Sequence, residues 1–292
     1  MSVDINRKTT NVLLDPEVAA EIWAKTLEES AIMKLARKVD MPGQGKKFQT
    51  ITGEPVADWV GETDAKPIGT HTFGTKTIQP YKLAVIEPFS EEFKRDKAAL
   101  YSECVRRLPF ALAKKFDETV MGTTAPGTDF DVLGDATQVS LIPASGKTVY
   151  DQFLAVDSTI SAADGIMGGI ALAPQGKSIV LGAVDGQSRP LFTAGVESGT
   201  VGNILGAPVT VSKGIYTTGT PNIVGLAGDF DEAIYGTVEG IKMAVSEEAV
   251  LKDGDDLIFL WQQNMFAVRF EIEVAFAVKD KAKFVLLPDE EE

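Results

Sequence analysis

The clearest pattern in the sequence is an alternation of apolar and polar residues near the C-terminus. From Phe266 to Val278 every second residue is apolar, and charged residues fill several of the positions between them. A repeat of two residues is typical of a β-strand with one buried face. Upstream the apolar residues shift to odd-numbered positions, and this change of phase predicts a bulge or turn at 262–264. We therefore expect a long β ribbon over residues 256–278.

Two β-rich stretches nearer the N-terminus, at 48–51 and 75–86, flank a connection that contains glycine and proline. They predict a hairpin with arms of about ten residues, or roughly 33 Å. An isolated two-stranded ribbon is only marginally stable in water. We therefore expect both long ribbons to lie against partners outside the molecule that carries them.

The strongest helical pattern begins at Ser90, which two glutamates follow, and continues to about Gly122. Apolar residues recur there mostly every four positions, as on one face of an amphipathic helix. The helix would be roughly 45 Å long. Pro109 lies in its interior and removes one backbone hydrogen bond, which predicts a bend. A weaker helical pattern starts at Asp15 and runs to about Arg37.

The composition changes near residues 121–128, and we place a domain boundary there. Residues 121–240 hold 20 of the 27 glycines, with 4 basic and 12 acidic side chains. Short β-type and helical pieces alternate in this region, which is typical of an α/β or α+β domain. The whole chain of 292 residues carries a net charge of −14, so phosphate backbones and anionic lipid surfaces repel it. Its longest non-polar run, 166–174, is too short to cross a bilayer.

The candidates for enzyme chemistry are weak. Residues 145–148 read Ser-Gly-Lys-Thr, but position 141 is leucine where a phosphate-binding loop needs glycine, so we interpret the string as the start of a helix. The single histidine, His71, has no motif that supplies a nucleophile and an orienting acid. Two aspartate clusters, at 129–135 and 253–256, lack the spacing of a calcium loop and are typical of turns. We expect no catalytic residue, cofactor or metal.

Three strings, in this order, carry a resemblance to a known family. They are Ala57-Asp-Trp-Val-Gly-Glu62, then Tyr81 to Ile86 leading into Ser90-Glu-Glu-Phe93, and then Asn264-Met-Phe-Ala-Val-Arg269 followed by Val274-Ala-Phe-Ala-Val278. An N-terminal arm, a long hairpin, a long helix and a glycine-rich domain accompany them, so the likeness spans nearly the whole chain. The sequence resembles the tailed-bacteriophage major capsid protein family.

The resemblance implies an α+β phage major capsid fold, which encapsulins share. We expect the following parts in chain order: an N-terminal arm and helix (1–46), an extended β-hairpin or E-loop (47–87), a peripheral domain with the spine helix and the long β ribbon (88–127 and 244–281), a glycine-rich α/β axial domain (128–243), and a C-terminal strand with an acidic tail (282–292). Many relatives carry an assembly domain ahead of the arm that is later cut off, so here such a segment is either absent or already removed.

The resemblance also implies a function. The chain would assemble with many copies of itself, as hexamers and pentamers, into an icosahedral shell that encloses double-stranded DNA without sequence-specific binding. Scaffold, portal and decoration proteins would be its other partners. The virion capsid would assemble in the host bacterial cytoplasm, with no cofactor and no membrane. Two alternatives stay open: an encapsulin-like nanocompartment shell protein and, from another class, a soluble α/β enzyme.

The resemblance further assigns roles to particular residues. The E-loop residues that would contact a neighbouring subunit are Trp59, Glu62, Lys66 and Phe73. Some relatives join subunits by a bond between a lysine and an asparagine with a glutamate as base, and the candidates here are Lys66, Asn264 and Glu271. Lowering a lysine pKa from about 10.4 to about 7 costs roughly 4 kcal/mol, so that reaction requires an apolar pocket. The alternative is a solvated lysine, a turn-forming asparagine and a glutamate paired with a cation.

Overall fold

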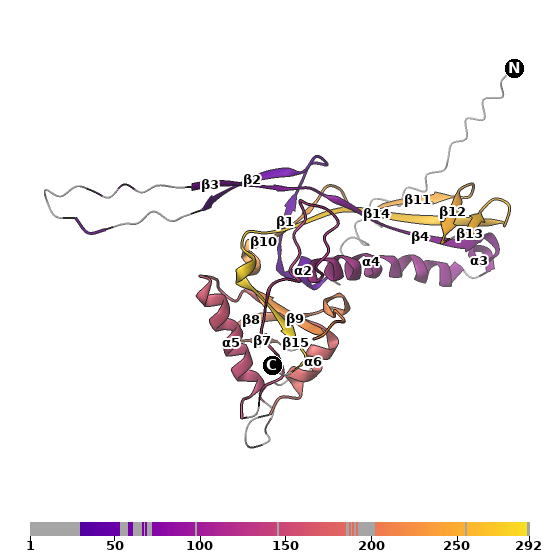
Figure 1. The fold of residues 1–292 in the computed structure, drawn as a ribbon. Helices are drawn as coiled ribbons and strands as arrows, with labels where there is room; N and C mark the ends of the chain where they lie inside the picture. The colour runs from indigo at the N-terminus through magenta and orange to yellow at the C-terminus, as the bar shows by residue number, and fades with distance from the viewer. Residues whose placement is uncertain are drawn as a thin grey trace.

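The molecule is elongated and is built around two larger β-sheets (Figure 1). In this computed structural model the described residues are 30–290, apart from 53–57, 61–65, 67, 69–71, 97, 145, 185–186, 188, 190, 192–201 and 255. The upper body in Figure 1 holds a five-stranded sheet and a long helix, and the lower body holds a six-stranded sheet with two shorter helices. A two-stranded hairpin extends from the upper body. This is the α+β architecture that the sequence predicts.

One long strand, β14 (Met265–Val278), forms the centre of the five-stranded sheet. Along one edge it pairs antiparallel with β4 (Tyr81–Ser90). Along the other edge it pairs antiparallel with β10 (Ala233–Thr237) and β11 (Lys242–Ser246). A fifth strand, β1 (Arg37–Asp40), lies parallel to β10. Both edges of β14 are therefore occupied by strands of the same chain.

The alternating face of β14 is buried as predicted, but the strand needs no outside partner. Its even-numbered side chains, from Phe266 to Val278, are all buried. They share a core with α4 (Ala98–Met121), where the rings of Phe116 and Phe276 meet edge to face at 6.2 Å. Because α4 covers one face and three strands cover the edges, β14 is satisfied within its own chain. The expectation of an external partner is wrong for this strand.

The predicted change of phase after β13 (Asp256–Phe259) is a turn. Asn264 adopts a φ of 54°, and the Met265 amide donates to the Leu260 carbonyl (2.8 Å), which closes the turn. β13 does not extend β14. Instead it pairs with β12 (Val250–Asp253) as a separate two-stranded ribbon.

The predicted spine helix corresponds to α3 (Glu91–Asp96) and α4, and residue 97 between them lies outside the described residues. Ser90 caps α3 as predicted, because its Oγ accepts a hydrogen bond from the Phe93 amide (3.1 Å). The rings of Phe89 and Phe93 stack at 5.9 Å, which holds α3 against the end of β4. The 24 residues of α4 correspond to about 36 Å. The longer helix therefore remains a strut along the sheet.

The six-stranded sheet has the strand order β5, β15, β9, β6, β8, β7. Its strands and the short 3₁₀ helices that flank them are β5 (Thr137–Gln138), β6 (Gly169–Leu172), β7 (Asn203–Ile204), β8 (Ala207–Val211), η1 (Lys213–Ile215), β9 (Ile223–Gly228), η2 (Phe230–Glu232), η3 (Lys281–Lys283) and β15 (Phe284–Pro288). Helices α5 (Val149–Ala162) and α6 (Pro174–Leu181) share a core with one face of the sheet. The other face packs with α4 and α2 (Ala31–Leu35).

The change from one sheet to the other does not fall at residue 243, where we expected a boundary. β10 lies before that position, yet it pairs with β14 of the five-stranded sheet. The chain crosses between the sheets at η2, directly after β9. In the opposite sense, β15 from the C-terminal segment belongs to the six-stranded sheet, where it lies between β5 and β9. Composition cannot reveal this exchange, because it depends on partners that are distant in sequence.

The N-terminal helical pattern is interrupted earlier than expected. Residues 15–29 lie outside the described residues, and α2 ends at Leu35. Arg37 begins β1 rather than ending the helix, because β1 pairs with β10. Pairing with a distant strand here overrides a weak local helical preference. Among the helices of the described chain, none is long and apolar enough to cross a membrane.

Candidate assembly surfaces

The hairpin β2–β3 projects from the upper body as a two-stranded ribbon (Figure 1). β2 (Lys46–Thr52) pairs antiparallel with β3 (Thr72–Ile78). Each strand has 7 residues and so reaches about 23 Å. The second predicted arm, 75–86, is divided between two strands, because the chain leaves the hairpin at Gln79 and Pro80 and continues as β4 in the body. The projecting hairpin is therefore made of β2 and β3, and residues 58–60, 66 and 68 are the described part of the connection between them.

Large apolar side chains near the end of this hairpin are exposed. Trp59 is 101 % exposed and Ile68 is 91 % exposed, and Lys66 between them is exposed as well. Single exposed apolar residues are common on protein surfaces, but aromatic residues are enriched at interfaces. Of the other two predicted contact residues, Glu62 lies outside the described residues and Phe73 lies on β3. The end of the hairpin is a candidate contact surface.

A second exposed apolar surface lies on the β12–β13 ribbon, and the sequence analysis did not predict it. Val250 and Phe259 are directly opposite each other and share one face with Leu257. All three are exposed, and Trp261 just beyond β13 is 80 % exposed. We call these four residues the β12–β13 patch. The sequence signal for this patch is the alternation of apolar residues at 257, 259 and 261. We attributed that alternation to one long ribbon.

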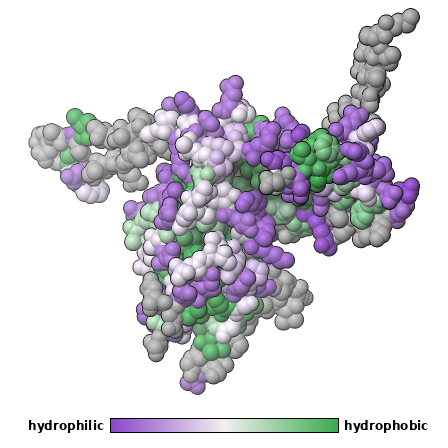
Figure 2. All heavy atoms as spheres, turned by 45° about the vertical axis from the view of Figure 1, so that its right-hand side comes forward, coloured by the Kyte–Doolittle hydropathy of each residue, from purple (hydrophilic) through white to green (hydrophobic). Residues whose placement is uncertain are grey.

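The two surfaces lie far apart on the molecule. Figure 1 places the hairpin and the β12–β13 ribbon at opposite ends of the upper body. In Figure 2, hydrophobic green atoms interrupt a largely purple surface on the right-hand arm, and a few green atoms are also seen on the hairpin at the left. Each subunit therefore presents apolar side chains in two directions at once.

The structure does not bring the three cross-link candidates together within one chain. Lys66 lies in the connection beyond β2, whereas Asn264 forms the turn before β14, at the other end of the upper body (Figure 1). Glu271 has cations close by: its Oε1 lies 3.2 Å from Arg269 Nε, and its Oε2 lies 3.7 Å from Lys82 Nζ. These contacts fit the alternative of a turn-forming asparagine and a paired glutamate. A bond to Asn264 would need the lysine of another copy.

Pro109 lies in the interior of α4 and is buried. Leu108 and Leu112 beside it belong to the core that α4 shares with β14. α4 extends on both sides of this proline, from Ala98 to Met121. The proline thus lies where the helix is held by the sheet, and the flexure expected there stays a prediction.

The Ser-Gly-Lys-Thr string leads into α5, as interpreted from the sequence. Thr148 Oγ1 accepts a hydrogen bond from the Asp151 amide (3.3 Å), and the Asp151 carboxylate accepts one from the Thr148 amide (2.8 Å). This reciprocal capping satisfies two amides at the helix start. The Thr148 amide and the Thr148 hydroxyl both donate to the Asp151 carboxylate, and they lower its pKa because they favour its charged form. His71 lies outside the described residues, and within them no 3 or more His, Cys, Asp or Glu side chains are placed to hold a metal ion.

A buried carboxylate that the sequence analysis missed joins α4 to two other elements. Asp117 accepts hydrogen bonds from Ser30 Oγ (2.6 Å), the Ala31 amide (3.1 Å) and Ser212 Oγ (2.8 Å). Burial raises the pKa of Asp117 to about 6, and the hydrogen bonds oppose that rise. Ser30 precedes α2 and Ser212 precedes η1, so one carboxylate fastens three elements together. The available signal was an acidic residue at helical spacing from apolar residues on the buried face.

Comparisons with known proteins agree with this geometry. The model of the phage capsid family matches residues 10–289. The chain is 33 % identical to the probable major capsid protein of Mycobacterium phage D29, over 94 % of this chain and 89 % of that protein. It is 26 % identical to the major capsid protein of Staphylococcus phage 80alpha, over 98 % of this chain and 87 % of that protein.

Solved structures share the fold. A chain from Gordonia phage Cozz has a TM-score of 0.74 at 22 % identity, over 91 % of this chain and 88 % of that chain. A chain from the capsid of a native GTA particle has a TM-score of 0.62 at 15 % identity, over 91 % of each chain. The family match over nearly the whole sequence, the major capsid proteins among its relatives and the shared fold lead to one conclusion: this chain belongs to the phage capsid family.

Proposed function

We propose that this phage major capsid protein assembles as hexamers and pentamers into a closed icosahedral shell around double-stranded DNA. The observation that carries the proposal is the projecting β2–β3 hairpin, with Trp59 and Ile68 exposed near its end. A neighbouring copy can cover these side chains, and full burial of a large apolar side chain contributes about 1.5 to 3 kcal/mol. One hairpin per subunit would then fasten each copy to the next around a ring.

The two exposed apolar surfaces support contacts between unlike faces of neighbouring subunits. The hairpin end and the β12–β13 patch differ in sequence and lie at opposite ends of the upper body. Contacts between unlike surfaces generate closed rings when the rotation between copies closes. We infer that other copies cover both surfaces in the assembled shell.

We infer the following roles for the parts of the fold. The β2–β3 hairpin is the E-loop, the five-stranded sheet with α3 and α4 is the peripheral domain, and the six-stranded sheet with α5 and α6 is the axial domain, where subunits meet in rings. Relative to the boundaries expected from the sequence, the peripheral domain gains β1 from the arm, most of β4 from the E-loop, and β10 with the first two residues of β11 from the axial domain. The axial domain gains β15. Each inferred domain then corresponds to one complete sheet.

The charge of the chain supports a container for DNA rather than a protein that condenses it. The net charge of −14 repels phosphate backbones, so the wall does not trap the genome. Repulsion between copies must then be offset by their interfaces, and obligate interfaces bury about 2,000 Å² or more. We infer a purely structural role in the virion, with assembly in the host cytoplasm alongside scaffold, portal and decoration proteins. The phage relatives favour this genome container over a nanocompartment that holds enzymes.

Removal of the hairpin end tests the proposal. One variant replaces residues 53–71 by a short Gly-Ser linker, and a second, Trp59→Ser with Ile68→Ser, keeps the hairpin at full length. Each is produced as the full chain is, alone and with the head proteins of the same phage, and examined by negative-stain electron microscopy. We expect closed particles from the full chain, soluble subunits from the shortened variant and fewer particles from the double substitution. Particles of normal size and number from the shortened variant would contradict the proposal.

A further inference from the structure

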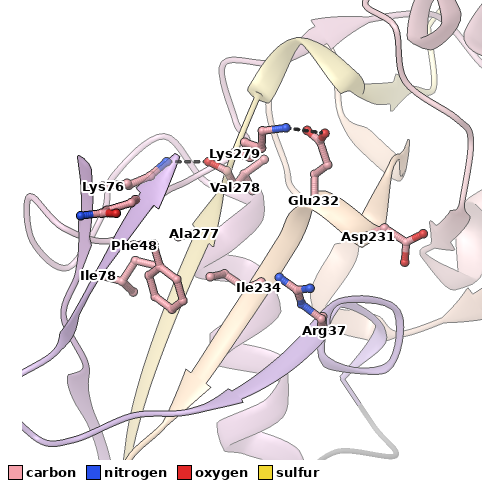
Figure 3. Close-up of a pocket in the computed structure, with 11 residues that line it drawn as sticks. Arg37, Phe48, Lys76, Ile78, Asp231, Glu232, Ile234, Ala277, Val278 and Lys279 are labelled. Atoms are coloured by element: carbon pink, nitrogen blue, oxygen red, sulfur yellow. Dashed lines mark hydrogen bonds and ion pairs between the residues drawn. The ribbon is translucent and has the colours of Figure 1, made fainter. Parts of the chain in front are cut away.

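A groove is lined in part by residues of the hairpin and in part by residues of β14 (Figure 3). The groove has a volume of about 320 Å³ and lies between the base of the hairpin and the five-stranded sheet. Apolar contacts join the two across it: Phe48 and Ile78 of the hairpin pack with Ala275 and Ala277 of β14. Such contacts are non-directional, so they hold the hairpin down without fixing the angle at which it projects.

A directional polar contact lies at the same place. Lys76 of β3 forms an ion pair with the carboxylate of Asp131, and its Nζ donates to the Val278 carbonyl (2.5 Å; Figure 3). The same carboxylate accepts a hydrogen bond from the Val278 amide (2.8 Å). Lysine, carboxylate and the last residue of β14 therefore form a three-way contact. Both charged side chains are partly buried, which reduces the screening of their attraction.

Further contacts attach the hairpin base to the same segment of chain. The Gln79 amide donates to the Asp129 carbonyl (3.5 Å), and the Asp129 amide donates to the Tyr81 hydroxyl (3.3 Å). A Cβ at Gly127 would collide with the Tyr81 ring, so this close approach requires glycine. Residues 127–131 thus meet the hairpin at its base.

Residues 127–131 are also packed onto α4. The Phe130 ring lies edge to face with Phe116 of α4 at 6.3 Å, and it lies 6.2 Å from Phe276 of β14. The Leu133 amide, just beyond this segment, donates to the Val120 carbonyl in the last turn of α4 (2.7 Å). A shift of the end of α4 would therefore move the residues that hold the hairpin.

We propose that Lys76 is a positioning residue that sets the direction of the hairpin through Asp131 and Val278. Residues 127–131 link that direction to the C-terminal end of α4. The proposal deepens the proposed function and rests on it only for the consequence in assembly, because the hairpin direction is a property of a single subunit. Without the ion pair, the apolar contacts at the groove leave the hairpin free to change its angle.

The first test measures the hairpin direction in isolated subunits. Spin labels are placed at Thr75 on β3 and at Lys242 on β11, in a Cys104→Ser background, and the distance distribution between them is recorded. Lys76→Met keeps the aliphatic part of the side chain and removes the charge. We expect it to widen the distribution at least twofold, whereas Lys76→Arg, which can still donate to both partners, leaves the distribution narrow.

A matched control tests whether the loss of any lysine charge widens the distribution, and a second variant is used if Lys76→Met does not fold. Lys82→Met removes an exposed lysine from β4, whose nearest carboxylate oxygens are 3.7 and 3.9 Å away, and we expect no widening. If Lys76→Met does not fold, Asp131→Asn replaces it, because the asparagine oxygen can still accept from the Val278 amide. A distribution as narrow as that of the wild type in the folded variant overturns the proposal.

The second test follows assembly by the same variants. We expect Lys76→Met to give at least tenfold fewer closed particles than wild type, and Lys82→Met to give the wild-type number. A widened distance distribution with a normal particle number would overturn the link between hairpin direction and assembly. If the wild type itself formed no particles under any condition, that would count against the proposed function, while the distance measurement would still decide the role of Lys76.

Discussion

The Oγ of Ser30 donates a 2.6 Å hydrogen bond to Oδ1 of Asp117, 87 residues further along the chain. Ser30 is buried, and its Oγ also accepts a hydrogen bond from the Met33 amide (3.0 Å) as the N-cap of α2. One hydroxyl therefore serves both a helix start and a buried carboxylate. Because α2 and α4 pack on the same face of the six-stranded sheet, this pair fixes how the start of the described chain meets the long helix.

We expect Ser30→Ala to lower the free energy of unfolding of the isolated subunit by about 2 kcal/mol. The substitution removes a helix cap and leaves the buried carboxylate one donor short. Urea unfolding followed by circular dichroism measures the change. Ser178→Ala is the matched control, because that exposed hydroxyl only bonds a carbonyl of its own helix, and we expect a loss below about 0.5 kcal/mol. Equal losses of unfolding free energy in the two variants would show that the Ser30–Asp117 hydrogen bond stabilises the subunit no more than the exposed hydrogen bond of Ser178.

The raised pKa of Asp117 predicts a dependence of stability on pH. Burial raises this pKa from 3.8 to about 6, so between these values the folded protein binds the proton more tightly than the unfolded chain. The stability contributed by the protonated group is fully present below about pH 4 and is lost as pH rises through 6, by about 3 kcal/mol in total. We therefore expect wild type to gain stability relative to Asp117→Asn on acidification from pH 7 to pH 4.

The measurement is the difference in unfolding free energy between wild type and Asp117→Asn at several pH values. Asp151→Asn is a control for which we expect a pH dependence of the opposite sign. Because hydrogen bonds from Thr148 lower the pKa of Asp151, its contribution is present at neutral pH and is lost as pH falls. If the wild-type and Asp117→Asn curves ran parallel from pH 4 to pH 7, the carboxylate would not be buried as described.

The β12–β13 patch predicts a variant that folds but assembles poorly. Trp261→Ser removes a side chain that is 80 % exposed, so we expect the thermal midpoint of the subunit to change little. Buried tryptophans are among the strongest contributors to interfaces, so the protein concentration needed for assembly should rise at least tenfold, or about 1.4 kcal/mol. Light scattering during assembly measures this threshold. The substitution Gln262→Ser at the neighbouring polar residue should leave this threshold concentration unchanged. An unchanged threshold in Trp261→Ser would show that the β12–β13 patch does not lie in an interface between subunits.

We expect no covalent bond between subunits in assembled particles. Glu271, the candidate base, already has Arg269 and Lys82 close by, and Asn264 forms a turn. Denaturing electrophoresis of purified particles should give one band at the monomer mass of 31.3 kDa. A ladder of higher masses that disappears in Lys66→Arg would instead support the lysine–asparagine bond.

Local patterns predicted the elements whose burial follows from their own sequence. The alternation from Phe266 to Val278 identified the buried face of β14, and the change of phase identified the turn at Asn264. Neither pattern contains information about strand edges. For this reason the pairing of β14 with β4, β10 and β11 was not predicted, and the strand was expected to need an outside partner.

The candidate site was predicted in part for the same physical reason. Trp59 and Lys66 could be placed near the end of a projecting hairpin, because two β-rich stretches flanked them. Asp117 was not predicted, because its hydrogen-bond partners Ser30 and Ser212 come from segments about 90 residues away on either side. The Lys76–Asp131 ion pair depends likewise on a fold that brings a hairpin strand beside the segment after α4.

In the assembly that we propose, a neighbouring subunit covers the end of the β2–β3 hairpin of each subunit. A cryo-electron microscopy reconstruction of particles formed by the full chain tests it most directly. We predict a density in which every hairpin extends from its own body and Trp59 is buried against another copy. A reconstruction in which each hairpin folds back onto its own subunit, or in which Trp59 remains in solvent, would contradict the proposed contact between subunits.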